Sequence, residues 1–262
     1  MSPFVISGSC FASLQTRVLQ TAPHFEGTIV EPHSIDSTAL LMSFVEKWEQ
    51  ARIRREARKK RSSRESLRTF HVPSYAELGR SIASDLEPLA RKGLLGEIVS
   101  QILFSDCCLQ VKIRYVNWEH TGSANRYGID LVGFVDDDLV VLVESKFCGG
   151  QDHPLSYLVQ RIRQGLSYLE DSSEFEIKLS DVYFRMLLSS SSTGSLPGPV
   201  AAKRLRECLE AGNYLDFVSA PFSTVGVNMN DILDPSKYDP PSRTAMFTTI
   251  NLINQKTLLT HL

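Results

Sequence analysis

The chain has 262 residues, of which 42% are hydrophobic and 22% are charged, and its formal net charge is −2. This apolar fraction is too high for a disordered chain, and no run approaches the ~18 apolar residues that a helix needs to span a bilayer. The first ten residues carry no basic stretch ahead of their short apolar run, so no secretory signal is expected and a cytoplasmic location is predicted.

The first part of the chain is predicted to form short strands and loops, followed by one long helix. Residues 1–35 have a mixed pattern. Asp36 or Ser37 can cap a helix that runs to about residue 61, and apolar side chains recur at helical spacing in its first half. Ten Lys or Arg and three Asp or Glu lie in residues 47–68, which gives this segment a net charge of +7 and leaves −9 for the rest of the chain. The near-neutral total therefore hides a strongly polarised chain.

This basic segment, residues 47–68, has two interpretations. A helix with a charge of +7 can contact several phosphates of a nucleic acid, with an affinity that falls steeply as salt is raised. The same pattern is also typical of a solvated helical face, or of a docking surface for an acidic protein. On the first interpretation DNA is a partner, and its contacts are predicted to be Arg54, Arg55, Arg58 and Lys59.

The remainder of the chain alternates helices with strand-like runs. A helical stretch is predicted over 74–105, and strand-like runs follow at 110–118, 127–135 and 139–147. The later predicted elements are a helix from Asp152 or Pro154 to about Glu170, a flexible connection at 189–199, a helix at 200–211, and strands at 213–220 and 247–253. This order predicts an α/β or α+β sheet domain over residues 74–262, preceded by an N-terminal region, residues 1–73, that carries the basic amphipathic helix.

The most informative stretch is residues 128–147, GIDLVGFVDDDLVVLVESKF, which is predicted to form a β-hairpin. If the turn is centred on Asp137, Asp130 lies opposite Glu144, and opposed residues of antiparallel strands share a face about 5 Å apart. Glu144 and Lys146 are two residues apart and share that face as well. One face of the sheet is therefore predicted to present two carboxylates and an ammonium group, and a slip of one residue in register would separate the carboxylates.

Two carboxylates held side by side repel one another, so a cation must compensate them or one must be protonated. Lys146 supplies one positive charge, and Mg²⁺ suits one or two carboxylates together with water and a substrate phosphate. A metal placed there could lower the pKa of a bound water, and Lys146 could orient that water or stabilise developing negative charge. These groups suit metal-assisted hydrolysis of a phosphodiester.

The triplet Glu-x-Lys is not informative alone, because chance yields about one in a chain of this length. Residues 176–178, Glu-Ile-Lys, form a second copy inside a polar stretch. The copy at Glu144 differs because it ends the apolar run LVVLV and has Asp130 across the hairpin. The alternative is a structural salt bridge at a strand end, but burying such charges is costly unless they are paired or used, which favours a functional site.

These residues resemble the PD-(D/E)XK nuclease superfamily over about residues 85–170. Its members have a helix with an acidic residue, a three-stranded meander and a further helix, with Asp on the second strand and E-x-K on the third. Here GID (128–130), ESK (144–146) and GE (96–97) match those places, although Ile129 replaces the proline of the name. The resemblance implies a restriction-endonuclease-like core (helix, three-stranded meander, helix, strand) and a nuclease that uses Mg²⁺ or Mn²⁺ held by Asp130, Glu144 and Ser145.

Within this superfamily, the runs GEIVSQILF, YGIDLVGF and VLVESKF are similar to those of the HamA-type effector nucleases of the Hachiman anti-phage system. That resemblance implies DNA cleavage that a helicase partner restrains until phage DNA is sensed. A type II-like restriction endonuclease has the same core and remains an alternative. A further alternative is a catalytically silent subunit that only binds nucleic acid.

Four further residues are weighed as supporting groups. Glu97 matches the acidic helix position of the family but lies nearly opposite the apolar stripe of its helix, so a solvated glutamate is an equal alternative. On the helix after the third strand, Gln160 and Arg163 are the candidates for contacting phosphate or the attacking water, and Gln164 is expected to point away from the core. Arg126 precedes Asp130 in a polar loop and could meet phosphate, although a role in loop solubility is favoured.

Reversing the charge of Arg54, Arg55, Arg58 and Lys59 to Glu is expected to lower affinity for duplex DNA by at least about tenfold at low salt, because each lost phosphate contact removes a released counterion. The same change should flatten the dependence of affinity on salt. Fluorescence anisotropy over a series of salt concentrations measures both effects. Unchanged DNA affinity together with lost binding to a protein partner would favour the docking surface instead.

Overall fold

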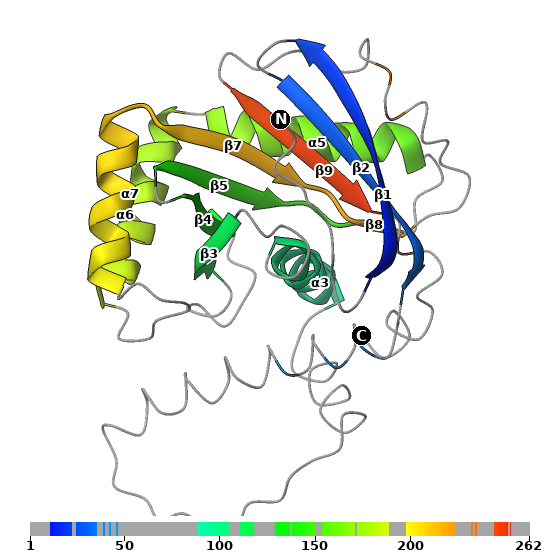
Figure 1. Ribbon diagram of the computed structural model, residues 1–262, viewed down its shortest axis with the longest axis horizontal. Coiled ribbons are helices and arrows are strands. Elements are labelled where there is room, and N and C mark those ends of the chain that lie inside the picture. The colour runs from blue at the N-terminus through cyan, green and yellow to red at the C-terminus, as the bar shows by residue number, and fades with distance from the viewer. Residues whose placement is uncertain are drawn as a thin grey trace, which may run out of the picture.

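The structure is a computed structural model, and its central feature is one mixed sheet with helices on both faces (Figure 1). It describes residues 11–22, 25–35, 39, 42, 46, 88–104, 111–117, 129–136, 138–149, 154–170, 172–188, 198–223, 232, 234, 244–250 and 252. The predicted α/β class is confirmed by this arrangement. Ala39, Met42 and Glu46 are helical, whereas the basic segment lies outside the described residues.

The sheet has seven strands in the order β1-β2-β9-β7-β5-β4-β3. Their bounds are β1 (Phe11–Ala22), β2 (Phe25–Ile35), β9 (Ala245–Ile250), β7 (Tyr214–Ser219), β5 (Leu139–Ser145), β4 (Leu131–Val135) and β3 (Val111–Val116). The pairs β2–β9, β9–β7 and β7–β5 are parallel, and the other three pairs are antiparallel. Strands β6 (Cys148–Gly149) and β8 (Phe222–Ser223) form a separate short parallel pair.

Strands β5, β7 and β9 lie in the middle of the sheet, and their side chains are buried on both faces. Continuous apolar runs such as LVVLV suit such strands, because neither face meets water. Since β1 and β2 extend this same sheet beyond β9, part of the N-terminal region is built into it. The proposed division at residue 73 stays a prediction.

The register of the β4–β5 hairpin agrees with the prediction. Paired residues run from Val135 with Leu139 to Leu131 with Val143, as a turn centred on residue 137 requires. Asp136 adopts a positive φ of 49°, and the amide of Asp138 donates a hydrogen bond to the carbonyl of Val135 over 3.1 Å, which closes the turn. The hairpin therefore delivers Asp130 and Glu144 to the same end of the sheet.

Two apolar cores cover the two faces of the sheet. Helix α3 (Pro88–Ile102) packs on one face, where Ile98, Val99 and Ile102 meet inward side chains of β4, β5 and β7. Helices α5 (Pro154–Glu170), α6 (Ser172–Leu188) and α7 (Gly198–Glu210) cover the other face. Figure 1 shows α5 running behind the strands and α6 beside α7 at one edge. Burial on both faces is what makes the strand ends a water-poor environment.

Most elements lie where the sequence predicts them, but two features differ: the length of β1 and β2, and the presence of α6. Strands β1 and β2 are long, with 12 and 11 residues, where short strands and loops were expected. Of the helical stretch predicted over 74–105, α3 accounts for Pro88–Ile102, and residues 74–87 lie outside the described residues. Helix α6 was not predicted, because a buried lysine interrupts its apolar stripe.

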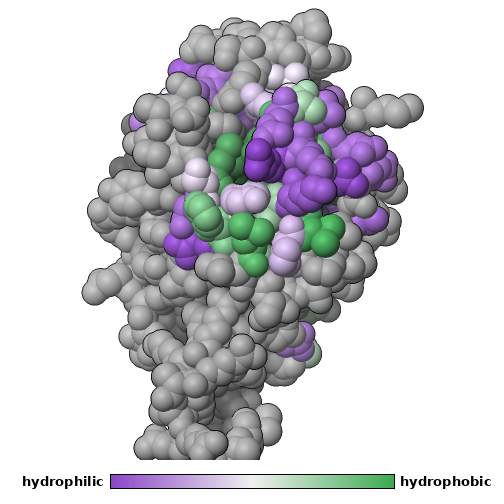
Figure 2. Space-filling view, turned by 90° about the vertical axis from the view of Figure 1, so that its left-hand side faces the viewer, coloured by the Kyte–Doolittle hydropathy of each residue, from purple (hydrophilic) through white to green (hydrophobic). Residues whose placement is uncertain are grey.

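The outer side of α6 and α7 carries a shallow, mostly apolar pocket of about 330 Å³. Figure 2 shows this face as a green apolar area beside a hydrophilic one. Leu179, Tyr183 and Leu209 line the pocket, and Phe184 at its edge is 60% exposed. Within the described part of the chain, no helix has the length and hydropathy to cross a membrane.

Candidate functional site

Three carboxylates from separate elements are buried together at one end of β5. Glu97 lies on α3, Asp130 immediately before β4 and Glu144 next to the end of β5. Their residues are only 4%, 5% and 4% exposed, respectively. The charge of Glu144 raises the pKa values of Glu97 and Asp130, and the charge of Glu97 raises that of Asp130, so the fold brings into one electrostatic cluster groups that are up to 47 residues apart in the chain.

The carboxylate of Asp130 is fixed against the end of β5. Its Oδ2 accepts a hydrogen bond of 2.7 Å from the amide of Ser145, and its own amide donates to the carbonyl of Val143 over 3.0 Å. Burial raises the pKa of Asp130 well above its usual range, and the charges of Glu144 and Glu97 raise it further. The Ser145 amide acts in the opposite direction, because it stabilises the ionised form.

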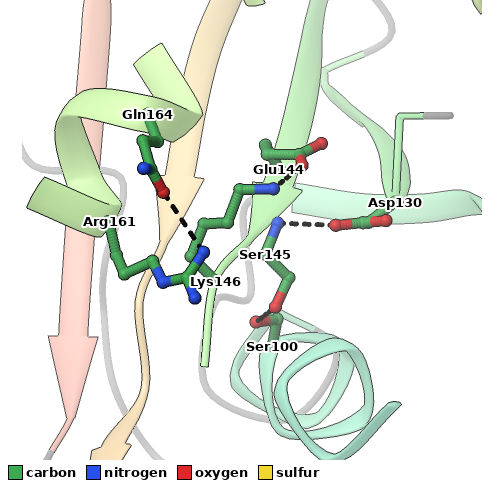
Figure 3. Close-up of polar contacts among 7 residues, drawn as sticks. All are labelled: Ser100, Asp130, Glu144, Ser145, Lys146, Arg161 and Gln164. Carbon is green, nitrogen blue, oxygen red and sulfur yellow. Dashed lines mark hydrogen bonds and ion pairs between the residues drawn. The ribbon is translucent and has the colours of Figure 1, made fainter. Parts of the chain in front are cut away.

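Glu144 and Lys146 form an ion pair on the face of the sheet that α5 covers (Figure 3). Lys146 donates to Oε1 of Glu144, whereas Oε2 is buried and accepts no hydrogen bond from the described residues. Burial raises the pKa of Glu144, although Lys146 and Lys178 oppose that shift. Burial by itself would lower the pKa of Lys146, but its pairing with Glu144 outweighs that effect and the pKa rises.

Glu97 is buried and belongs to the cluster, which excludes a solvated glutamate. Residues 94–104 of α3 and the turn after it are buried throughout, so the helix is covered on all sides. Burial raises the pKa of Glu97 to about 8, with a further contribution from Glu144 and an opposing one from Lys146. Its Oε2 accepts no hydrogen bond from the described residues. The apolar stripe on the helical wheel therefore predicted only one of the buried faces of this helix.

Close packing between α3 and the end of β5 holds the cluster in place. A Cβ on Gly96 would lie 2.9 Å from Cβ of Phe147 and 3.2 Å from Oγ of Ser145, so glycine allows the helix to approach. The hydroxyl of Ser100 is 2.9 Å from that of Ser145 and donates to that of Ser219 over 2.7 Å. This chain of hydroxyls joins α3, β5 and β7 at the strand end that carries Glu144.

Arg161 of α5, which was not among the predicted candidates, turns toward the site. Gln160 and Arg163 are both exposed, and their contact with a substrate stays a prediction. Figure 3 shows the guanidinium of Arg161 beside Lys146. It donates to the hydroxyl of Tyr157 and, over 3.1 Å, to Oε1 of Gln164, which is exposed as expected.

Lys178 is a charged residue that the sequence interpretation passed over. It belongs to the second Glu-x-Lys triplet, yet it is only 3% exposed and its charge acts on Glu144. Its Nζ lies 3.0 Å from the ring centroid of Tyr168, and Nζ of Lys146 lies 5.4 Å from the same centroid. One signal could have revealed it: Lys178 occupies the stripe of α6 formed by the buried residues Val182 and Met186.

The donor chemistry fits Mg²⁺, which favours one or two carboxylates completed by water and a substrate phosphate. Asp130 and Glu144 would hold the ion together with the backbone carbonyl of Ser145, and the buried Oε2 of Glu144 is an oxygen that such an ion would satisfy. As the side chains stand, no three His, Cys, Asp or Glu residues of the described ranges converge as metal ligands do. A metal would therefore have to draw the carboxylates together.

No protein-family model matches the chain, and no curated protein matches it either. The resemblance to nucleases rests on the three short motifs and on the site just described. The remaining predicted contacts, Arg54, Arg55, Arg58, Lys59 and Arg126, lie outside the described residues.

Replacing Glu97 by Gln is expected to stabilise the metal-free protein. The pKa of Glu97 is about 8 in the folded protein and near 4.5 in the unfolded chain, so folding takes up a proton between these values. The contribution of Glu97 to the stability of the wild type is therefore most favourable below pH 4.5, declines as the pH rises to 8, and levels off above. Glu97→Gln removes this decline and should gain about 1 to 3 kcal/mol at pH 8.

Urea unfolding at pH 5 and pH 8, with a chelator present, measures this difference between Glu97→Gln and the wild type. Glu210→Gln, at an exposed position of α7, serves as the control and should follow the wild type at both values. A Glu97→Gln curve parallel to that of the wild type would contradict the burial of an ionisable group at this position.

Replacing Gly96 by Ala is expected to destabilise the protein by about 1 to 3 kcal/mol, because the added methyl group overlaps the Phe147 backbone region and the Ser145 hydroxyl. Alanine is the better helix former, so helix propensity alone predicts the opposite sign. The midpoint of denaturant unfolding decides between the two. A more stable variant would show that α3 and β5 are not in tight contact.

Proposed function

We propose that the protein is a metal-dependent nuclease that hydrolyses phosphodiester bonds of DNA, with a restriction-endonuclease-like core in residues 74–262. The observation that carries this proposal is the buried cluster of Glu97, Asp130, Glu144 and Lys146 at the end of β5. The order α3, β3–β4–β5 meander, α5 and parallel β7 supports the same core, with α6 and α7 inserted before β7.

A purely structural salt bridge explains this cluster less well. Glu144 and Lys146 satisfy one another, but Asp130 and Glu97 add two further buried carboxyl groups whose pKa values are raised by burial and by repulsion. Burying ionisable groups beside one another costs stability, and such clusters are concentrated at functional sites. A structural role requires none of the extra carboxylates.

Each residue of the cluster has a separate role in the proposed hydrolysis. Bound Mg²⁺ would polarise the scissile phosphate and lower the pKa of the attacking water. Asp130 is held for this task by the Ser145 amide, and Glu144 by its place on β5. Lys146, whose side chain is 25% exposed, can reach the substrate to orient the nucleophile and stabilise negative charge on the phosphate. Glu97, with its pKa near 8, can accept or release a proton near neutral pH.

Within this activity, the role we favour is that of an anti-phage defence effector in the cytoplasm, restrained by a helicase-like partner. The support is the similarity of three sequence runs, GEIVSQILF, YGIDLVGF and VLVESKF, to HamA-type nucleases; parts of these runs lie in α3, β4 and β5, respectively. A silent DNA-binding subunit is disfavoured, because the full set of Asp130, Glu144 and Lys146 is kept in one cluster.

Glu144→Ala and Lys146→Met are each expected to lower magnesium-dependent DNA cleavage at least about a hundredfold, because each removes a group that acts on the reacting phosphate. Plasmid and linear DNA are incubated with the full chain and Mg²⁺, with and without a helicase-like partner, and cut products are resolved on gels. Glu207→Ala, at an exposed position of α7, is the control and should cleave as the wild type does. Full cleavage by either site variant would falsify the site, and cleavage that persists in excess chelator would exclude a metal-dependent reaction.

A further inference from the structure

We propose that Arg161 of α5 is a phosphate-binding residue: held beside Lys146 by Tyr157 and Gln164, its guanidinium contacts a DNA backbone phosphate next to the one that is cut. This inference rests on the proposed function for the identity of the ligand. None of the proposed hydrolytic steps uses this cation, and its contact with phosphate can be measured without any cleavage.

Neutral groups hold the guanidinium of Arg161 in place. It donates to the hydroxyl of Tyr157 and, over 3.1 Å, to Oε1 of Gln164, which lie about one turn away on either side along the same helix. Its Cζ lies 4.8 Å from the centroid of the Tyr157 ring, so the ring supports it as well. These contacts order the side chain without neutralising it, and its positive charge stays available to an anion.

The guanidinium of Arg161 keeps donors for a further acceptor. Of its five N–H groups, the contacts with Tyr157 and Gln164 use two. Its Nε is buried and has no hydrogen-bond partner, which is costly until an acceptor arrives. Among the residues that the structure describes, the ion pairs leave Arg161 without a carboxylate. A planar fork with free donors and an uncompensated charge suits the oxygens of a phosphate.

Arg161 lies at the same end of β5 as the buried carboxylates. Figure 3 shows its guanidinium beside Lys146, on the opposite side of that lysine from Asp130. Its charge acts on both Lys146 and the thiol of Cys148, just beyond the end of β5. Two turns further along α5, the ring of Tyr168 has its centroid 5.4 Å from Nζ of Lys146. One stripe of α5 therefore runs along this lysine, and Arg161 belongs to it.

The position of Arg161 indicates which phosphate it contacts. Lys146 lies between Arg161 and Asp130, so a reacting phosphate at the carboxylates is nearer to Lys146 (Figure 3). Two neighbouring cations repel one another, and a backbone that lays successive phosphates across both would relieve that repulsion. Arg161 then binds outside the reacting group, where a contact holds the substrate and the transition state equally well.

Arg161→Gln is expected to weaken binding of a short DNA duplex about tenfold at about 0.1 M salt, and to lower the slope of log affinity against log salt by about one, because one phosphate contact is lost. Fluorescence anisotropy measures both in the full chain, with excess chelator to prevent cleavage. Arg206→Gln is the matched control. The side chain of Arg206 is 67% exposed on α7 and pairs with Glu210, so its loss should change the affinity less than about twofold.

Equal affinity and equal salt slope in Arg161→Gln and the wild type would overturn the inference, as would a wild type that binds no DNA at low salt. Arg161→Lys keeps the charge but not the planar fork, so it should restore the slope and only part of the affinity. Tyr157→Phe removes the hydroxyl acceptor and keeps the ring, and should weaken binding about threefold. Unchanged affinity in Tyr157→Phe would contradict the part assigned to the hydroxyl.

Cleavage separates this inference from the proposed function. In a wild type that cuts DNA, Arg161→Gln should raise KM about tenfold and leave kcat within about threefold, since the contact lies outside the reacting phosphate. A wild-type KM in this variant would overturn the inference while the nuclease stands. Weakened DNA binding by Arg161→Gln, in a protein that never cuts with Mg²⁺ even beside a helicase-like partner, would uphold the phosphate contact and reject the nuclease.

Discussion

Carboxylates buried side by side repel one another, and the arrangement around β5 follows from the need to contain that repulsion. Glu97, Asp130 and Glu144 are nearly free of solvent, so water cannot screen their charges. Several features reduce this repulsion. Two lysines lie in the same region, a backbone amide donates to Asp130, and the raised pKa of Glu97 keeps that group largely protonated at neutral pH. Oε2 of Glu97 and Oε2 of Glu144 still accept no hydrogen bond from the described residues, and a bound divalent cation would compensate the remaining negative charge.

The sheet supplies the rigidity that such a cluster requires. Parallel pairing of β5 with β7 places Ser145 beside Ser219, and the Ser100 hydroxyl bridges both from α3. Because the ladder, the serine hydroxyls and the close approach at Gly96 all meet at the same strand end, a shift of α3 or β7 would also shift the carboxylates. Precision at the site is therefore a property of the packing beneath it rather than of the acids themselves.

Local periodicity and turn chemistry were enough to predict the hairpin and its register from Leu131 to Val143, since a two-residue repeat leaves little choice. The predicted pairing of Asp130 with Glu144 lies one residue beyond that ladder and stays a prediction. They could not predict β9 between β2 and β7, because parallel pairing of distant segments leaves no local pattern. Helix α6 and Lys178 were missed for a physical reason as well: a charge on a core stripe looks like a surface residue until its partner is known. Glu97 illustrates the same limit, since double coverage of α3 depends on the whole fold.

The charges of the buried cluster nearly cancel, and the charges of the whole chain also nearly cancel, to a net −2. Glu144 is paired with Lys146, the pKa of Asp130 is raised well above its usual range, and Glu97 is largely protonated at neutral pH, so the metal-free cluster carries little uncompensated negative charge. Such a cluster has little attraction for a phosphate. Addition of one divalent ion would give it a charge near +2, which matches a phosphodiester together with an attacking hydroxide. If the protein is the nuclease proposed, the metal rather than the lysines would make the site attractive to its substrate, and the first encounter with DNA would fall to the basic segment, residues 47–68, whose charge of +7 is separated from the acids along the chain.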